Sequence, residues 1–222
     1  MAHDLRTPLT GILGHTDLLQ RRLERAEPPA RDWLRRQVDG LRASARRMSS
    51  LVNEITDVMQ LQMGQRLALQ RDVVDVADVV RAVARMLEAG TYGATVAVDA
   101  PAEAVVEGDR ARLERVLQNV LSNAIKYSPA ATPVQVILQP REDEVIIRVQ
   151  DRGVGIPADE LLHIFTPYYR ASTAASIPGT GLGLAGARAI VAQHGGQITL
   201  ESRVGEGTVV TVSLPRHAPA LP

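Results

Sequence analysis

Several chemistries are excluded by what the chain lacks. Its 222 residues include no cysteine, which rules out disulfide bonds, thiolate zinc sites and cysteine nucleophiles. Aromatic residues make up only 3% of the sequence, so the core must be built mainly from leucine, valine, isoleucine and alanine. No apolar run approaches the roughly 20 residues that a membrane-spanning helix needs, and the first residues lack the apolar segment of a signal peptide.

Charge is balanced, and lysine is almost absent. The 25 basic and 25 acidic residues cancel, which argues against nucleic acid or an anionic membrane surface as the main partner, because both require a basic patch. We therefore expect a cytoplasmic chain without direct membrane contact, which is also compatible with the inner part of a longer membrane receptor. Among the basic residues only Lys126 is a lysine, and this exception suggests a specific role for it.

The first 63 residues are patterned as two helices. Apolar positions alternate steps of four and three residues, which is the spacing of a helix–helix seam, and Pro28 and Pro29 interrupt it. The two seams comprise Leu5, Leu9, Ile12, Thr16, Leu19 and Leu23, then Leu34, Val38, Leu41, Ala45, Met48, Val52, Ile55, Met59 and Gln62. We predict an antiparallel helical hairpin over 1–63 that forms half of a four-helix bundle in a homodimer. The alternative is a hairpin that packs on the downstream domain of its own chain.

After a linker at 64–66, the pattern changes to mixed helices and strands over 67–214. Helices are predicted at 76–88, 110–127 and 182–194, because capping residues precede amphipathic runs and glycines follow the last of them. Short strands are predicted at 73–76, 95–98, 104–106, 134–138, 144–149, 197–201 and 208–213. The expected fold class is α+β: the helical hairpin followed by an α/β sandwich, a mixed sheet with helices on one face. The proline- and alanine-rich residues 215–222 are expected to be a disordered tail.

A polar stripe interrupts the predicted helix 110–127. Asn119, Asn123 and Lys126 are spaced by four and three residues, so they share one face. Asparagine is a poor helix former, and its amide oxygen suits Mg²⁺, while Lys126 can reach a phosphate as a point charge. Glu114, further back on the helix, fits a water-holding role. The alternative is a solvated stripe without function.

Two glycine-rich runs follow. Asp151, Gly153 and Gly155 come directly after a predicted strand; a carboxylate there can accept a proton from an exocyclic amine, although the same run also suits an ordinary turn. Residues 179–184 open a helix, whose free N–H groups favour phosphate. The long, pattern-poor segment 156–178 between them is typical of a lid.

The order of these motifs resembles that of the sensor histidine kinases of two-component systems. Residues 3–9, His-Asp-Leu-Arg-Thr-Pro-Leu, resemble their phosphoacceptor box, residues 119–127 the N box, and 151–155 the G1 box. Ile164-Phe165 resembles the F box and 179–184 the G2 box. The resemblance implies that the second domain has the ATP-binding fold shared with gyrase, Hsp90 and MutL, with its lid over the triphosphate.

The resemblance also implies roles for particular residues. His3 would accept the γ-phosphoryl group of ATP, with Asp4 taking its proton and Thr7 orienting a water for dephosphorylation of a response regulator. Mg²⁺ would be held by Asn123 with Asn119. The remaining nucleotide contacts would come from the boxes and from the lid, namely Lys126, Tyr127, Asp151, Gly153, Gly155, Tyr169, Arg170, Gly179, Thr180, Gly181, Leu182, Gly183 and Leu184.

The implied function is ATP-dependent autophosphorylation of His3 and transfer to an aspartate on the receiver domain of a response regulator. The alternative is a dimeric scaffold or phosphatase of the same family that binds nucleotide without phosphorylating itself. Gly186 departs from the family, which usually has a bulky aliphatic residue there. The short segment before His3 also departs from the family, and because it is short we expect weak autophosphorylation. The other histidines have no adjacent carboxylate and are expected to be structural or at the surface.

Overall fold

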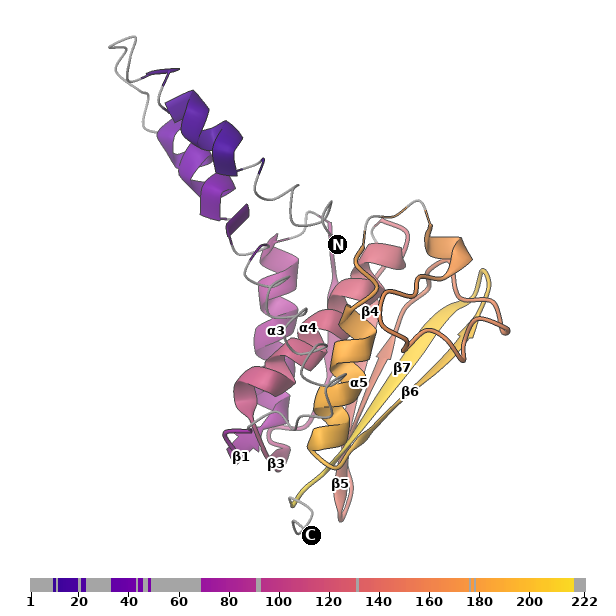
Figure 1. Ribbon diagram of the computed structural model, residues 1–222. Coiled ribbons are helices and arrows are strands. Elements are labelled where there is room, and N and C mark those ends of the chain that lie inside the picture. Colours follow the sequence, from indigo (N-terminus) through magenta and orange to yellow (C-terminus); the bar gives the residue numbers. More distant parts are fainter. Residues whose placement is uncertain are drawn as a thin grey trace. The chain divides into compact units, whose positions relative to one another are not determined.

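The computed structural model describes residues 10, 12–19, 21–22, 33–42, 44–45, 48, 69–90, 93–130, 132–175, 177 and 179–217. Internal contacts divide the chain into two compact units, Met1–Met59 and Gln60–Pro222 (Figure 1). The predicted phosphoacceptor residues His3, Asp4 and Thr7, and the predicted linker 64–66, lie outside the described residues.

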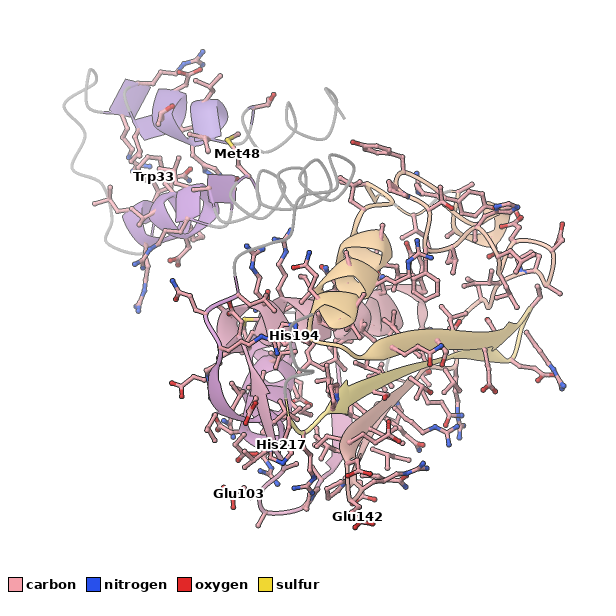
Figure 2. The ribbon with its side chains drawn as sticks, turned by 60° about the horizontal axis from the view of Figure 1, so that its bottom comes forward. Trp33, Met48, Glu103, Glu142, His194 and His217 are labelled. Carbon is pink, nitrogen blue, oxygen red and sulfur yellow. The ribbon has the colours of Figure 1, made fainter. Side chains whose placement is uncertain are left out.

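The first unit contains two helical segments, 12–19 and 33–42, that contact each other through polar groups. The Nδ1–H group of His15 donates to Gln37 Oε1, 2.6 Å away. The guanidinium of Arg22 lies over the ring of Trp33, 4.5 Å from its centroid; Trp33 is labelled in Figure 2. These contacts between residues that are distant in sequence confirm the predicted pairing of two helices. They also assign His15 a structural role.

Only some side chains of the predicted seam are packed between the two helical segments. Ile12, Leu19 and Leu41 are half-buried within the single chain. Thr16 and Val38, which alternate with them along the seam, are exposed, and 45% of Val38 is accessible. A helical stripe that is covered on one side only leaves an apolar edge for a further helix pair.

The second unit contains three helices and seven strands within its described part. In chain order these are β1 (Asp72–Asp75), α3 (Val76–Gly90), β2 (Val96–Asp99), β3 (Val105–Gly108), α4 (Arg110–Tyr127), β4 (Val134–Pro140), β5 (Glu144–Gln150), the 3₁₀ turn η1 (Ser172–Ala174), α5 (Gly183–Gln193), β6 (Gln197–Arg203) and β7 (Gly207–Pro215). Five strands form a sheet in the order β2-β4-β5-β7-β6, and β1 and β3 form a separate antiparallel ribbon. In the large sheet β2 runs parallel to β4 and the other neighbours are antiparallel, which confirms the predicted mixed sheet.

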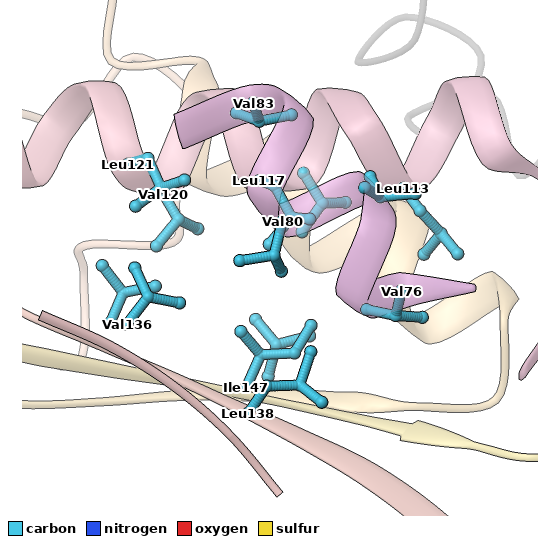
Figure 3. Close-up of a cluster of buried hydrophobic side chains, with 14 of the residues drawn as sticks. Val76, Val80, Val83, Leu113, Leu117, Val120, Leu121, Val136, Leu138 and Ile147 are labelled. Atoms are coloured by element: carbon cyan, nitrogen blue, oxygen red, sulfur yellow. The ribbon is translucent and has the colours of Figure 1, made fainter. Parts of the chain in front are cut away.

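The helices cover one face of this sheet (Figure 1). Every second residue of β4 and β5 is buried, including Val136, Leu138 and Ile147, and these side chains point toward α3 and α4 (Figure 3). From the helices, Leu117 and Val80 fill the same core. Fully burying a side chain of this size contributes about 1.5–3 kcal/mol, so aliphatic packing substitutes for the scarce aromatics.

Local capping fixes where α4 begins and ends. The Asp109 carboxylate accepts the backbone N–H of Arg112 at 3.1 Å, which satisfies one of the free donors of the first turn. Ser128 is already extended, because Pro129 disfavours helix in the residue before it. The predicted helix 110–127 is therefore confirmed at both ends.

The last strand extends further than predicted. Pro215 still pairs with Glu144, and the N–H of Arg216 donates to the carbonyl of Asp143 at 2.9 Å. Arg216 in turn accepts the N–H of Glu107 at 2.8 Å. The predicted tail at 215–222 therefore begins too early, because backbone bonds from the β4–β5 turn and from β3 hold the chain as far as residue 216.

Candidate functional site

The polar stripe of α4 lies beside the start of α5. The Nδ2 group of Asn119 donates to the carbonyl oxygen of Gly183, the first residue of α5, at 3.1 Å. This bond fixes the amide of Asn119, with its nitrogen toward α5 and its oxygen free to act as an acceptor. Asn123 and Lys126, one and two turns further along, are half-buried like Asn119.

Lys126 is held close to the second glycine run. Its Nζ donates to the hydroxyl of Tyr127 at 3.2 Å and lies 4.8 Å from the centre of that ring. A Cβ atom placed on Gly179 would stand 2.8 Å from Lys126 Nζ, so the backbone passes the ammonium group at close range. The only lysine of the chain therefore stands between α4 and the run 179–184.

The start of α5 has no side-chain cap. Leu182 occupies the N-cap position and is 1% exposed, so it anchors the helix in the core without satisfying the first N–H groups. Gly181 has a φ of +73°, and its carbonyl accepts the N–H of Tyr168 at 3.0 Å. Thr180 Oγ1 accepts the N–H of Leu182 at 3.3 Å. The N–H groups of Gly183 and Leu184 thus face an uncapped helix end, which favours an anion.

Asp151 is a buried carboxylate at the end of β5. It is 7% exposed, and its Oδ1 accepts the N–H groups of Gly153 at 2.8 Å and of Thr208 at 3.1 Å. Its Oδ2 has no hydrogen bond to any described residue. Burial raises the pKa of the carboxyl above its ordinary value, and the two N–H groups oppose this rise. One oxygen is therefore used to fix the loop, and the other remains able to accept a proton from a ligand.

The loop after Asp151 is held against the β6–β7 turn. Gly155 has a φ of +68°, and a Cβ atom there would lie 2.0 Å from the carbonyl oxygen of Arg203, so no side chain fits. Gly205 donates its N–H to the carbonyl of Val154 at 3.0 Å. The N–H of Val154 points to the carbonyl of Tyr127 at 3.3 Å, which links this loop to the end of α4.

Tyr169 and Arg170 make their described contacts within the lid segment. Arg170 Nη2 donates to the carbonyls of Ala174 at 2.8 Å and Ala175 at 3.2 Å, and also to that of Ile177. Desolvation and the charge of Glu160 raise the pKa of the Tyr169 hydroxyl. The segment that looked pattern-poor is therefore ordered by side-chain-to-backbone bonds around η1.

A side-chain hydrogen bond joins the lid to the loop after Asp151. Thr173 Oγ1 donates to the carbonyl of Gly155 at 2.7 Å. Glu160 accepts the N–H of Ser172 at 2.8 Å, and hydrogen bonds from Ser172 lower the pKa of Glu160. The first bond joins the lid to the loop, and the second fastens the two ends of the lid to each other.

Two residues of the site were missed in the sequence. Thr208 accepts the backbone N–H of Asp151 at its carbonyl oxygen, and its own N–H is one of the two that donate to the Asp151 carboxylate. Ser202 Oγ accepts the N–H of Ile156 at 2.9 Å and donates to Gly207. The available signal is the Gly-Glu-Gly-Thr run at 205–208, where the predicted strand 208–213 begins.

Two family models match the chain. One, described as a His Kinase A (phospho-acceptor) domain, matches residues 1–64. The other, described as a histidine kinase-, DNA gyrase B- and HSP90-like ATPase, matches residues 108–218. The chain belongs to the sensor histidine kinases. The α4 stripe, Asp151 and the start of α5 all lie within the second match, so they belong to the ATP-binding domain of a histidine kinase.

Known histidine kinases align with almost the whole of this kinase chain. Histidine protein kinase DivJ of Caulobacter vibrioides is 35% identical over 97% of the chain, which spans 36% of DivJ. Sensor-like histidine kinase SenX3 of Mycolicibacterium smegmatis is 34% identical over 98% of the chain, which spans 56% of SenX3. The kinase chain thus covers about a third to a half of the length of these relatives.

Solved histidine kinase structures are similar to this chain in fold. The histidine kinase AdeS of Acinetobacter baumannii superposes with a TM-score of 0.64 at 25% identity, covering 96% of this chain and 98% of AdeS. Full-length ShkA in complex with AMPPNP gives a TM-score of 0.66 at 26% identity, covering 99% of this chain and 45% of ShkA. Among the described residues of the kinase, no helix has the length and apolar character needed to cross a bilayer.

Proposed function

We propose that this chain is the catalytic core of a histidine kinase that transfers the γ-phosphoryl group of ATP to His3. The carrying observation is the hydrogen bond of Asn119 to Gly183 together with the close approach of Lys126 Nζ to Gly179, which brings a polar helix face to an uncapped helix start. The AMPPNP in the ShkA structure supports a nucleoside triphosphate as the ligand. Since ATP is a cytoplasmic substrate, we assign this part of the kinase to the cytoplasm.

The adenine would be recognised at Asp151. Its Oδ1 is fixed by two N–H groups, which leaves Oδ2 to accept the exocyclic amine proton of adenine. Guanine carries a carbonyl at the equivalent position, and two acceptors would face each other. This predicts selection for ATP over GTP.

The phosphates would lie between α4 and α5. Lys126 and the N–H groups of Gly183 and Leu184 provide positive charge and donors where negative charge develops. The amide oxygens of Asn119 and Asn123 are hard, neutral ligands that fit Mg²⁺, which keeps several waters and takes few protein ligands. When bound, Mg²⁺ would neutralise phosphate charge. Tyr127, Tyr169, Arg170, Gly179, Thr180, Gly181 and Leu182 would complete the walls of the site.

In the reaction, a bond forms between an imidazole nitrogen of His3 and the γ-phosphorus, while the bond from that phosphorus to the bridging oxygen breaks. ADP leaves with the electron pair of the broken bond, and Asp4 takes the imidazole proton. We further propose transfer of this phosphoryl group to an aspartate of a response regulator and a regulator phosphatase step that uses Thr7. A homodimer formed by the 1–63 hairpins would carry these steps.

Incubation with γ-labelled ATP and Mg²⁺ tests the proposal. An acid-labile, base-stable label that disappears in His3→Ala but remains in His15→Ala is expected. A chain that binds ATP with ordinary affinity yet takes up no label, even in the presence of a longer native chain that is labelled, would instead be a scaffold or phosphatase.

A further inference from the structure

His194, where α5 ends, is a buried histidine that the proposed reaction does not use. It is 2% exposed and is labelled in Figure 2. A buried polar ring must satisfy both nitrogens or lose free energy. The partners of this ring therefore indicate what it does.

The two ring nitrogens have opposite roles. Nδ1 lies 2.8 Å from the carbonyl oxygen of Ile190, which can only accept, so Nδ1 carries the hydrogen. Nε2 accepts the backbone N–H of Asp109 at 3.0 Å, so it must be unprotonated. This arrangement requires the neutral ring. Protonation of Nε2 would place its N–H directly against the N–H of Asp109, two donors facing each other.

Asp109 connects this ring to the segment that leads into β1. While its backbone N–H donates to His194, its Oδ1 caps α4 and its Oδ2 accepts the N–H of Gln70 at 3.0 Å. The next residue, Arg71, donates from Nη2 to the carbonyl of Gln193 at 2.9 Å. The chain entering the nucleotide domain is thus bonded to the start of α4 and to the end of α5.

The start of α4 and the end of α5 are the helix ends that lie away from the candidate site. Asn119, Asn123 and Lys126 lie in the second half of α4, and Gly183 begins α5. The entering segment is therefore bonded to two helices whose other parts form the candidate site.

The charges around the ring disfavour its protonation. Arg71 on the entering segment and Arg112 on α4 oppose a positive ring, whereas the Asp109 carboxylate favours it. On β3 the residue against the ring is Gly108, where an added Cβ atom would lie 3.0 Å from Cδ2 of the imidazole. Burial is the largest effect and lowers the pKa of His194 below its ordinary value.

We propose that His194, Asp109 and Gln70 form a proton-sensitive latch that fastens the segment entering the nucleotide domain to the ends of α4 and α5. With neutral His194 the latch is closed. Protonation removes the acceptor for the Asp109 N–H, displaces Asp109 and releases Gln70 and Arg71. The latch regulates the connection into the domain and does not depend on which phosphoryl group the domain transfers.

The sign of the pH effect follows from the neutral ring. In the unfolded chain a histidine titrates near pH 6.5, whereas the folded chain keeps His194 neutral to lower pH. The stability that the latch contributes is therefore complete above about pH 6.5 and is lost as pH falls toward the folded pKa. A single proton changes the opening equilibrium by up to about tenfold per pH unit in this window.

Hydrogen exchange of the full chain tests the latch. The protection factors of the Gln70 and Asp109 amides should fall together as the pH is lowered from 7.5 to 5.5, while that of Ile147 in the core changes little. His194→Gln, which keeps an acceptor near Nε2 but cannot titrate, should retain both protection factors at pH 5.5. His217→Gln, at an exposed histidine, should behave like the unchanged chain. An equal loss in His194→Gln would overturn the proposal.

A second measurement covers the case in which His194→Gln does not fold. In the unchanged chain, one NMR titration follows the His194 ring and the Gln70 amide. A shared midpoint supports the latch. A ring that titrates while the Gln70 amide stays protected, or a ring that remains neutral until the domain unfolds, overturns it.

Discussion

The side chain of Asn119 donates a hydrogen bond to the carbonyl of Gly183, 3.1 Å away, and so joins α4 to the first residue of α5. The side chain of Asn123, one turn later, has no hydrogen bond to a described residue. The two asparagines of the stripe therefore differ in what they contribute to the fold, although both are proposed to hold Mg²⁺. This difference allows binding and stability to be separated by mutation.

We expect Asn123→Ala to abolish the Mg²⁺ dependence of ATP binding while leaving the free energy of unfolding unchanged or about 0.5 kcal/mol higher, since alanine is the better helix former. Asn119→Ala should weaken ATP binding as well, but should also cost about 0.5–1.5 kcal/mol through the lost bond to Gly183. Calorimetric ATP titrations with and without Mg²⁺, beside denaturant unfolding, measure both. Unchanged Mg²⁺-dependent affinity in Asn123→Ala would remove it from the metal site.

Asp151→Asn should weaken ATP binding and stabilise the nucleotide-free chain. The Asn Oδ1 can still accept the N–H groups of Gly153 and Thr208, but an NH₂ group replaces the Oδ2 that is proposed to face adenine. ATP affinity should fall about 10–100-fold, as expected for one mismatched buried polar contact. GTP affinity should fall less.

The gain in stability of Asp151→Asn should depend on pH. Burial raises the folded pKa of Asp151, so its ionisation costs stability as pH rises through that pKa. Asparagine does not ionise, and the melting temperature of the variant should exceed that of the unchanged chain at pH 7. At pH 2.5, well below the ordinary aspartate pKa of about 3.9, the carboxyl is protonated in both states and the difference should vanish. A difference that is the same at both pH values would contradict the assignment.

Gly186→Ala should stabilise the second unit by about 0.5–1 kcal/mol. Gly186 is the fourth residue of α5, and a Cβ atom there meets nothing within 4 Å, so alanine gains helix propensity without a clash. Gly155→Ala is the matched opposite case, because its Cβ would overlap the carbonyl of Arg203, and should cost more than about 1 kcal/mol. Denaturant midpoints compare the two. A destabilised Gly186→Ala would show that the space beside it is needed.

Val38→Glu should convert a dimer to a monomer in sedimentation. Val38 is an exposed seam position in the single chain, and a carboxylate there would be buried without a partner in a four-helix bundle. Arg36→Glu, also exposed but off the seam, should leave the dimer intact. If the unchanged chain is monomeric at tens of micromolar, the four-helix prediction is wrong.

The sequence predicted the helices and strands better than the way in which they pair and pack. The bounds of α4 agree with the prediction because Asp109, the apolar repeat and Pro129 are all local signals. The placement of β7 between β5 and β6 could not be predicted, since pairing such as Val149 with Val210 depends on packing between distant segments.

The same limit applies to the site. Asn119, Asp151 and Gly181 belong to motifs that can be recognised locally. Thr208 acts on Asp151 across 57 residues, and Arg170 orders the lid through backbone carbonyls, which leave no pattern in the sequence. The role of Gln70 depends on its backbone N–H, which every residue except proline possesses.

The pairing of Asp151 with Thr208 also sets an order of events during synthesis. Asp151 leaves the ribosome long before β7, yet β7 is an interior strand of the sheet and supplies the N–H that holds the carboxylate. A nascent chain that ends before residue 207 therefore has the Asn/Lys helix, the aspartate and the lid, but an open sheet and an unfixed carboxylate. Nucleotide binding at the candidate site is therefore expected only after β7 has been synthesised and has paired with β5.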